Sequence, residues 1–295
     1  MSLVSFVETK NSGYLALKES ILHSLNLINF KLTRKVKSVI IKPNMCYYYH
    51  PSTGEVTDPV FVGALIEAIR EKFSTVSEIF IAESDASAMK CKFVFPILGY
   101  DRLAKEKNVK LINLSEMESK IVNVNVNGVD IKFYIPEIFN EIDLMINVPK
   151  PKYMGLVKIS CALKNIFGCN AYPKKYVYHK ILNEAIVGIN KLIKSHLTIV
   201  DGIVVRGKYT KRLNMVASSE DPVAVDAAVS EIMGINPEKV RYIALASEEK
   251  IGNINFLPVG NFLYFKGEFP KKKLKDNILE QFLLPLYRKL FQFQE

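Results

Sequence analysis

Short apolar segments rich in β-branched residues alternate with amphipathic segments along most of this chain, and this alternation constrains the fold more than any other feature. Helices are predicted over residues 98–108 and about 178–195, and after Asp58 and Asp221, which each precede a proline suited to a first helical turn. Strands that alternate with helices favour an α/β fold, with a mostly parallel sheet and helices on both faces. Buried strands are predicted at residues 38–44, 77–85, 109–114, 142–150 and 196–202.

Residues 115–136 interrupt this alternation. The segment alternates with period two around Asn127-Gly128, which is a type I′ turn signal, so it predicts a β-hairpin inserted outside the main sheet. Residues 214–234 predict a strand, a cap and a helix, a further helix is expected near Pro237, and residues 262–269 predict an edge strand. No repeat or linker appears, so residues 1–295 are interpreted as one α/β domain.

The last segment, residues 271–295, is basic and places apolar residues along one side of a predicted helix that Pro285 would kink. Such a helix can dock on its own domain, join two subunits of a homodimer or lie on a membrane surface. We expect docking on its own domain, with dimerisation as the second interpretation.

The net charge of +10 comes mainly from lysine. Nucleic acid, an anionic membrane surface or an acidic small molecule would each complement it. The alternative is a lysine-coated surface of a heat-adapted protein, which the scarcity of glutamine also favours. No apolar run reaches the ~18–20 residues of a membrane span. The start of the chain lacks a signal-peptide pattern, and the four cysteines show no C-x-x-C spacing, so a cytoplasmic location is expected.

Polar residues follow the predicted strands, and open parallel sheets bind ligands beyond the carboxyl ends of their strands. Turn residues are polar in any case, but several endings rich in lysine, asparagine and acid together predict one polar pocket for an anion. Ser218 also lies near a predicted helix start, where free N–H groups favour phosphate. The candidate binding residues from these endings are Lys42, Asn44, Asp85, Lys150, Lys152, Ser218, Asp221 and, one helical turn further, Asp226.

The segment ISCALKNIFGCNAYPKKYVYHK, residues 159–180, adds the candidates Lys164, Asn165 and His179. If residues 158–169 are helical, Lys164 and Asn165 share the polar side. Lys164 can then hold a phosphate or carboxylate, or form a Schiff base; the alternative is a lysine at a helix end. His179 suits general acid–base chemistry or a structural role, and Asp201 suits hydroxyl or metal binding or the shaping of a turn.

The ordered fragments KPN (42–44), INVPKPK (146–152), ALKNIFG (162–168), Lys-Lys then His (174–179), TIVDG (198–202) and ASSEDPVAVDA (217–227) resemble the domain-of-unknown-function family 362. Many members of that family carry an added ferredoxin-like segment with closely spaced cysteines, which is absent here. The family pattern also places a histidine where this sequence has Tyr153. The resemblance therefore implies a site and no particular reaction.

Three functions fit these features. The first is an enzyme that acts on an anionic small molecule or cofactor precursor, with Lys164, His179 and Asp201 as candidate catalytic residues. The second is a redox or metal-linked protein that uses Cys46, Cys161 or Cys169, with an iron–sulfur cluster or a redox partner protein. The third is a nucleic-acid-binding protein, which charge alone suggests. We favour the first. No phosphate-binding loop or other common catalytic motif is present, so the cofactor stays unknown.

Overall fold

The computed structural model describes residues 1–32 and 34–270. A mixed sheet forms its centre, with strands in the order β12-β1-β11-β10-β7-β2-β3-β4 and with β8 and β9 attached beside β10. The strands of this sheet are β1 Ser2–Glu8, β2 Ser38–Pro43, β3 Glu78–Glu83, β4 Lys110–Asn113, β7 Leu144–Val148, β8 Lys152–Met154, β9 Lys158–Ser160, β10 Leu197–Arg206, β11 Thr210–Ser219 and β12 Phe256–Gly260.

Helices connect most of these strands. The α-helices are α1 Tyr14–Leu27, α2 Pro59–Lys72, α3 Cys91–Leu98, α4 Tyr100–Lys107, α5 Ile138–Glu141, α6 Ala162–Ile166, α7 Leu182–Leu192, α8 Pro222–Ile232, α9 Arg241–Glu248 and α10 Phe262–Phe265. Short 3₁₀ helices are η1 Pro51–Thr53, η2 Leu114–Glu116, η3 Phe167–Cys169, η4 Lys175–Ile181 and η5 Pro237–Lys239.

The predicted α/β class is confirmed. Strands β10, β7, β2, β3 and β4 run parallel to their neighbours in this part of the sheet. Strand β11 departs from the pattern, because it pairs antiparallel with both β10 and β1. The carboxyl ends of β2, β3, β7 and β10 therefore share one edge of the sheet, called here the carboxyl edge. The end of β11 lies at the opposite edge.

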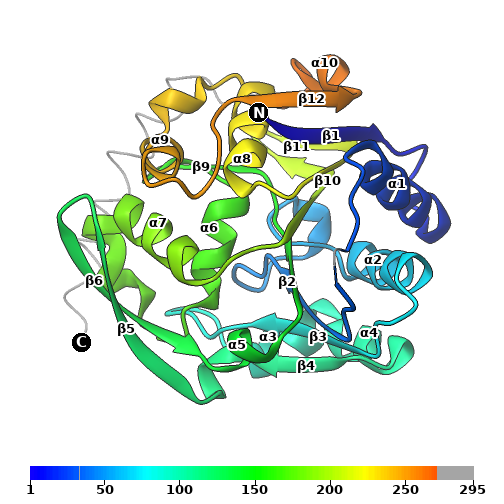
Figure 1. Ribbon diagram of the computed structural model, residues 1–295. Coiled ribbons are helices and arrows are strands. Elements are labelled where there is room, and N and C mark those ends of the chain that lie inside the picture. Colours follow the sequence, from blue (N-terminus) through cyan, green and yellow to red (C-terminus); the bar gives the residue numbers. More distant parts are fainter. Residues whose placement is uncertain (33, 271–295) are drawn as a thin grey trace.

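Alternate side chains of the central strands enter two separate apolar cores. Val39 and Ile41 of β2 belong to the core that also contains residues of α1, α2, α3 and α4. Ile40, between them, belongs to the core formed with α6, α7, α8 and α9. Helices α1 and α2 lie on one side of the sheet and α6, α7 and α8 on the other (Figure 1). This two-sided burial explains why the strands are nearly uniformly apolar in sequence.

The hairpin predicted for residues 115–136 is present as β5 Ser119–Val126 and β6 Val129–Pro136, which form a sheet of their own. Asn127 and Gly128 both have positive φ, at 50° and 80°, as a type I′ turn requires. The hairpin projects from the lower left of Figure 1 and packs against α7.

Three local predictions need correction. Residues 158–169 are not one helix: Lys158 lies in β9 and only Ala162–Ile166 is α-helical, followed by η3. Residues 262–269 begin with helix α10, and the edge strand is the preceding β12. Strand β10 continues past Gly202 to Arg206 through a bulge, since its antiparallel partner β11 supplies hydrogen bonds beyond the Asp-Gly pair. The helix expected near Pro237 is present, since the short η5 begins at Pro237 and α9 follows it.

The predicted terminal helix, residues 271–295, lies outside the described residues. Among the helices that are described, none combines the length and apolar character that crossing a membrane requires.

Candidate functional site

Two buried ion pairs mark the carboxyl edge. Lys42 Nζ of β2 lies 2.7 Å from Glu83 Oε2, at the end of the neighbouring β3. Lys150, just after β7, places its Nζ 2.8 Å from Asp201 Oδ1 of β10. These four side chains are at most 4% exposed. Each lysine is therefore neutralised by an acid from an adjacent strand, which holds the strand ends together.

Three asparagine side chains form a relay beside Lys42. Asn147 Nδ2 donates to Ala162 O (2.9 Å), and Asn165 Nδ2 donates to Asn147 Oδ1 (2.8 Å) and to Lys42 O (3.0 Å). Asn44 Nδ2 then donates to Asn165 Oδ1 (3.1 Å). Because two backbone carbonyls receive these amide groups, the orientation of the whole relay is fixed. Asn44 Oδ1 is left as a buried acceptor with no hydrogen-bond partner among the described residues.

The short helix α6 is held at its start by Asp226 of α8. Asp226 is fully buried, and its carboxylate accepts hydrogen bonds from Ala162 N (2.5 Å) and Leu163 N (3.1 Å). Burial raises the pKa of Asp226 to about 7, although the two backbone hydrogen bonds act in the opposite direction. Asp226 thus positions the helix that carries Lys164 and Asn165, which differs from the ligand-binding role predicted for it.

Lys164 is the partly buried cation of this helix. No carboxylate lies within ion-pair distance of its Nζ in residues 1–32 and 34–270, and its ammonium lies 5.8 Å from the centre of the Phe167 ring. The pKa of Lys164 is lowered to about 8, chiefly by burial; the like charges of Lys152 and Lys42 act in the same direction, and Cys46 opposes them. The Lys164 amine is therefore close to its protonation midpoint near neutral pH.

Lys175, at the start of η4, is a second partly buried lysine for which the described residues supply no carboxylate partner. Its Nζ contacts Ser84 Oγ, and lies 3.5 Å from Gly168 O. Ser84 Oγ also donates to Gly168 O. Burial lowers the pKa of Lys175 to about 8, with Lys42 acting in the same direction and Glu83 opposing it. The charge of Lys42 therefore acts on both Lys164 and Lys175.

Lys152 is also buried at this edge and donates from Nζ to Glu55 O (2.7 Å). The carboxylate of Glu55 is shared, because its oxygens lie 3.9 Å from Lys152 Nζ and 3.3 Å from Arg206 Nε. Asp201, besides pairing with Lys150, accepts from the backbone N of Asp58 (3.0 Å). Lys152 of β8 and Asp201 of β10 therefore both connect their strands to the loop that precedes α2.

The structure places four predicted site residues outside this cluster or in structural roles. Asp85 accepts from the backbone N of Cys91 (2.8 Å) and from Lys90 Nζ (3.0 Å), which fixes the start of α3. Ser218 bonds with two serines from β1 and α1, and Asp221 caps α8. Both lie toward the opposite edge because β11 is antiparallel. His179 has an exposed side chain on η4.

Three residues of the cluster were missed as candidates, although their segments had been singled out. Glu83 and Asn147 are strand endings like those chosen, and Lys175 belongs to the Lys-Lys pair of the family-like pattern. The sequence signal that could have identified Glu83 and Asn147 is their position at the end of a buried strand. Both strands are neighbours of β2, which carries Lys42. Register brings Asn147 opposite Lys42.

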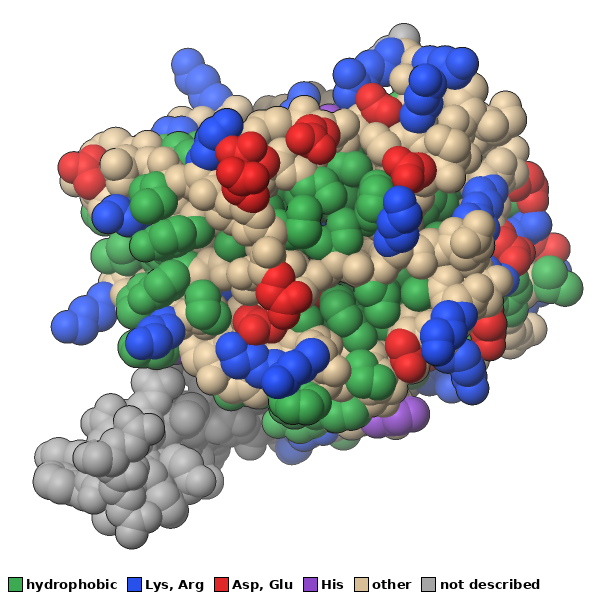
Figure 2. Space-filling model, turned by 90° about the horizontal axis from the view of Figure 1, so that it is seen from below, with side chains coloured by type: hydrophobic (Ala, Val, Ile, Leu, Met, Phe, Trp, Pro, Cys, Tyr) green, Lys and Arg blue, Asp and Glu red, His purple; other side chains and the backbone are tan. Residues whose placement is uncertain are grey.

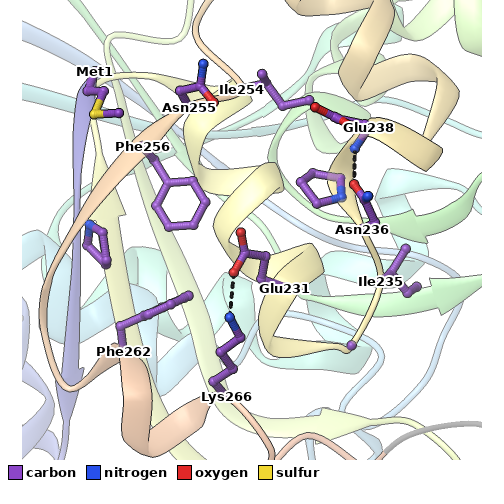
Figure 3. Close-up of a pocket in the computed structure, with 13 residues that line it drawn as sticks. Met1, Glu231, Ile235, Asn236, Glu238, Ile254, Asn255, Phe256, Phe262 and Lys266 are labelled. Carbon is purple, nitrogen blue, oxygen red and sulfur yellow. Dashed lines mark hydrogen bonds and ion pairs between the residues drawn. The ribbon is translucent and has the colours of Figure 1, made fainter.

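Neither of the two described surface pockets contains any predicted site residue. One, of about 670 Å³, lies between the end of α8 and the edge strand β12, and Phe256, Phe262 and the Glu231–Lys266 ion pair are among its lining side chains (Figure 3). The other, of about 280 Å³, lies between α2 and α4. In the part of the chain that the structure describes, no group of three or more His, Cys, Asp or Glu side chains is arranged to hold a metal ion.

Comparisons with known proteins give a family and distant relatives. The model of a family described as "Domain of unknown function (DUF362)" matches residues 39–231. A thylakoid-associated protein of Synechocystis is 24% identical, over 84% of this chain and 78% of that protein.

Two solved structures are similar at 13% identity. One is a Thermotoga maritima protein, with a TM-score of 0.44 over 82% of this chain and 60% of its own. The other is the lactate racemase apoprotein of Thermoanaerobacterium thermosaccharolyticum, with a TM-score of 0.49 over 80% of this chain and 58% of its own. This chain therefore spans less than two thirds of either of these two proteins.

Proposed function

This chain belongs to the DUF362 family, whose function is unknown. From its own site residues, we propose that it binds and acts on an anionic small molecule at the carboxyl edge. The observation that carries this proposal is Lys164, a partly buried ammonium with no carboxylate partner among the described residues. A buried cation without a counter-ion is costly, and an anionic ligand would remove that cost.

The surroundings of Lys164 support a binding site over a merely structural lysine. The asparagine relay fixes Asn165 beside it, and Asp226 fixes the helix that carries both. A site whose groups are already positioned loses little entropy when its ligand binds. An amine with a pKa of about 8 can also transfer a proton or attack a carbonyl near neutral pH, which fits the enzymatic interpretation.

The redox alternative finds less support in the cysteines. Cys91, Cys161 and Cys169 are buried, and burial raises the pKa of each thiol, for Cys169 to about 12. Metal binding and thiol redox chemistry both need the thiolate. Buried thiols with raised pKa values stay protonated near neutral pH, so they suit packing better than chemistry.

Native mass spectrometry of the full chain, purified from its own host, tests the proposal. We expect a bound anionic molecule that is released on denaturation, is absent from Lys164→Met, and is retained by Lys174→Met. Lys174 is an exposed lysine of the same segment and therefore a matched control. Equal occupancy in Lys164→Met, or no bound molecule in the unmodified protein, would contradict it.

The pH dependence of binding gives a second test. Only the protonated Lys164 amine attracts an anion, so the affinity for sulfate, whose own charge stays constant in this range, should be highest below pH 8 and should fall as the pH rises through about 8. Calorimetric titrations between pH 6.5 and 9.5 would measure this. An affinity that stays constant across the range would exclude Lys164 as the anion-binding group.

A further inference from the structure

We propose that the last segment of this chain, residues 271–295, binds the groove between the end of α8 and β12. This groove is the larger of the two surface pockets described above, with a volume of about 670 Å³ (Figure 3). The inference concerns a surface away from the anion site and does not depend on the proposed function. It gives a place to the segment for which the sequence predicts docking on its own domain.

Apolar side chains form more than half of the groove lining, and several of them are only partly buried. Ile235, Ile254 and Phe256 pack against the core on one side and stay partly exposed on the other. The ring of Phe256 lies 5.6 Å from the ring of the buried Phe262. Contiguous exposed apolar surface of this kind marks a place where another apolar surface binds.

The edge strand beside the groove does not favour the addition of a further strand. In the described part of the chain, β12 is the last strand of its sheet and pairs only with β1. Pro258 lies in the middle of β12 and has no N–H group to donate to another strand. A second copy that extended the sheet through β12 would meet an interrupted edge. The groove is therefore better suited to the side chains of a helix than to a strand.

The described chain ends beside this groove. Phe269 is buried, and its ring lies 5.7 Å from the ring of Tyr153. The hydroxyl group of Tyr153 donates to the carbonyl oxygen of Met233 (2.7 Å), which directly precedes the groove residue Gly234. One side chain thus bridges the end of the described chain and the groove. A segment that starts so close to its binding surface is present there at a high effective concentration.

The segment also has the apolar pattern that such a groove binds. Leu274, Ile278 and Phe282 recur every four residues ahead of Pro285, so they share one side of the predicted helix and span about 12 Å along its axis. Amphipathic helices bind apolar grooves through anchors at this spacing. The residues between Pro270 and Leu274 allow up to about 13 Å of extended chain, which leaves the first anchor free to reach the groove.

Photo-cross-linking of the full chain tests the proposal. The probe p-benzoylphenylalanine replaces Asn255, an exposed residue of the groove lining, so the core beneath the groove stays intact. Light and isotope-labelled heavy protein are mixed before irradiation, and the joined peptides are identified by mass spectrometry. We expect cross-links to residues 271–295 within one chain. The same probe at Phe93, an exposed residue of α3, should give none, because α3 packs in the other core.

Variants of the segment show whether the cross-links come from specific docking. Phe282→Asp should lower their yield about tenfold, because the apolar groove would desolvate the new carboxylate. Gln281→Asp is the matched control and should leave the yield unchanged, since this position is turned by about 100° around a helix from Phe282. Cross-links that join light to heavy chains would mean that the segment of a second copy occupies the groove, and would overturn docking within one chain. An absence of cross-links to residues 271–295, or an equal yield from Phe282→Asp, would overturn the groove as the binding place.

Discussion

Gly168 lies where a side chain would press on the buried Lys42–Glu83 pair. A Cβ at this position would be 3.0 Å from Lys42 Cε and 3.1 Å from Glu83 Oε1. Gly168→Ala should therefore destabilise the protein by about 1–3 kcal/mol, the usual cost of overpacking. Urea unfolding would measure the loss. Gly155→Ala is the control, because no atom lies within 4 Å of its Cβ position, and equal effects of the two changes would contradict the argument.

The Lys42–Glu83 pair makes a separate prediction about buried charge. Lys42→Met leaves the Glu83 carboxylate buried without its partner, which should cost about 3–5 kcal/mol. Lys42→Met combined with Glu83→Gln removes both charges and should cost clearly less than that single change. Urea unfolding of the two single variants and the double variant forms a complete cycle. A double variant that loses the sum of the single effects would show that the pair is not coupled.

Individual residues also show the limit of sequence reasoning. Lys42, Asn44, Lys150 and Asp201 were predicted as strand endings, and the structure does bring them to one edge. Glu83 ends β3 and Asp85 comes two residues later, and the sequence pattern could not tell which of the two acids faces Lys42. The difference arises because Asp85 is used to fix the start of α3. Helix α3 itself was not predicted.

Helix α6 illustrates how one element depends on another that is distant in sequence. Its five residues are too few to be stable alone, since isolated short helices are marginal in water. Asp226, more than sixty residues later, accepts its first free N–H groups. A helical pattern over residues 158–169 could not reveal this dependence, because the ordering group belongs to α8.

The raised pKa of Asp226 gives α6 a predictable pH response. Burial favours the protonated carboxyl in the folded state, so the stability that this group contributes is complete below about pH 4 and is lost as the pH rises through about 7. Between pH 5 and 8 the wild type should lose on the order of 2–3 kcal/mol relative to Asp226→Asn, which cannot ionise. Urea unfolding at both pH values would measure this difference.

Ser230→Ala is the matched control for that comparison. Ser230 Oγ donates to the backbone oxygen of Asp226 and leaves the carboxyl group untouched, so this variant should keep the pH response of the wild type. A difference between the wild type and Asp226→Asn that is the same at pH 5 and pH 8 would show that the carboxyl titrates at a similar pH in the folded and unfolded states.

Strand direction explains the largest error at the level of elements. Alternating strands and helices indicated a mostly parallel sheet, and that class is correct. Strand β11, however, follows β10 through a short turn and is antiparallel, so Ser218 lies opposite Ile199 near the start of β10. An apolar segment has the same residue pattern whether its strand runs parallel or antiparallel to its neighbour. The sequence therefore placed Ser218 and Asp221 at the wrong edge of the sheet.

The whole chain carries a net charge of +10, yet among the described residues several lysines pair with acids, which is not the arrangement expected of a nucleic-acid interface. Lysines such as Lys18 and Lys110 pair with neighbouring acids on the surface. Figure 2 shows basic and acidic side chains interspersed among hydrophobic ones, without a continuous basic stripe on that face. Backbone phosphates are bound by clustered cations that release counter-ions, and paired lysines contribute less to this.

We therefore expect only weak, non-specific binding to a duplex of 20 base pairs at 150 mM salt, no tighter than about 1 µM. Fluorescence anisotropy at several salt concentrations would measure both the affinity and its salt dependence. Lys164→Met should not change this binding, because one partly buried lysine adds little to an electrostatic surface. Tight binding with a log–log salt slope steeper than about −5 would instead mean that many lysines act together on phosphates, and the charge of this protein would then belong to a nucleic-acid interface rather than to its surface and one small anion site.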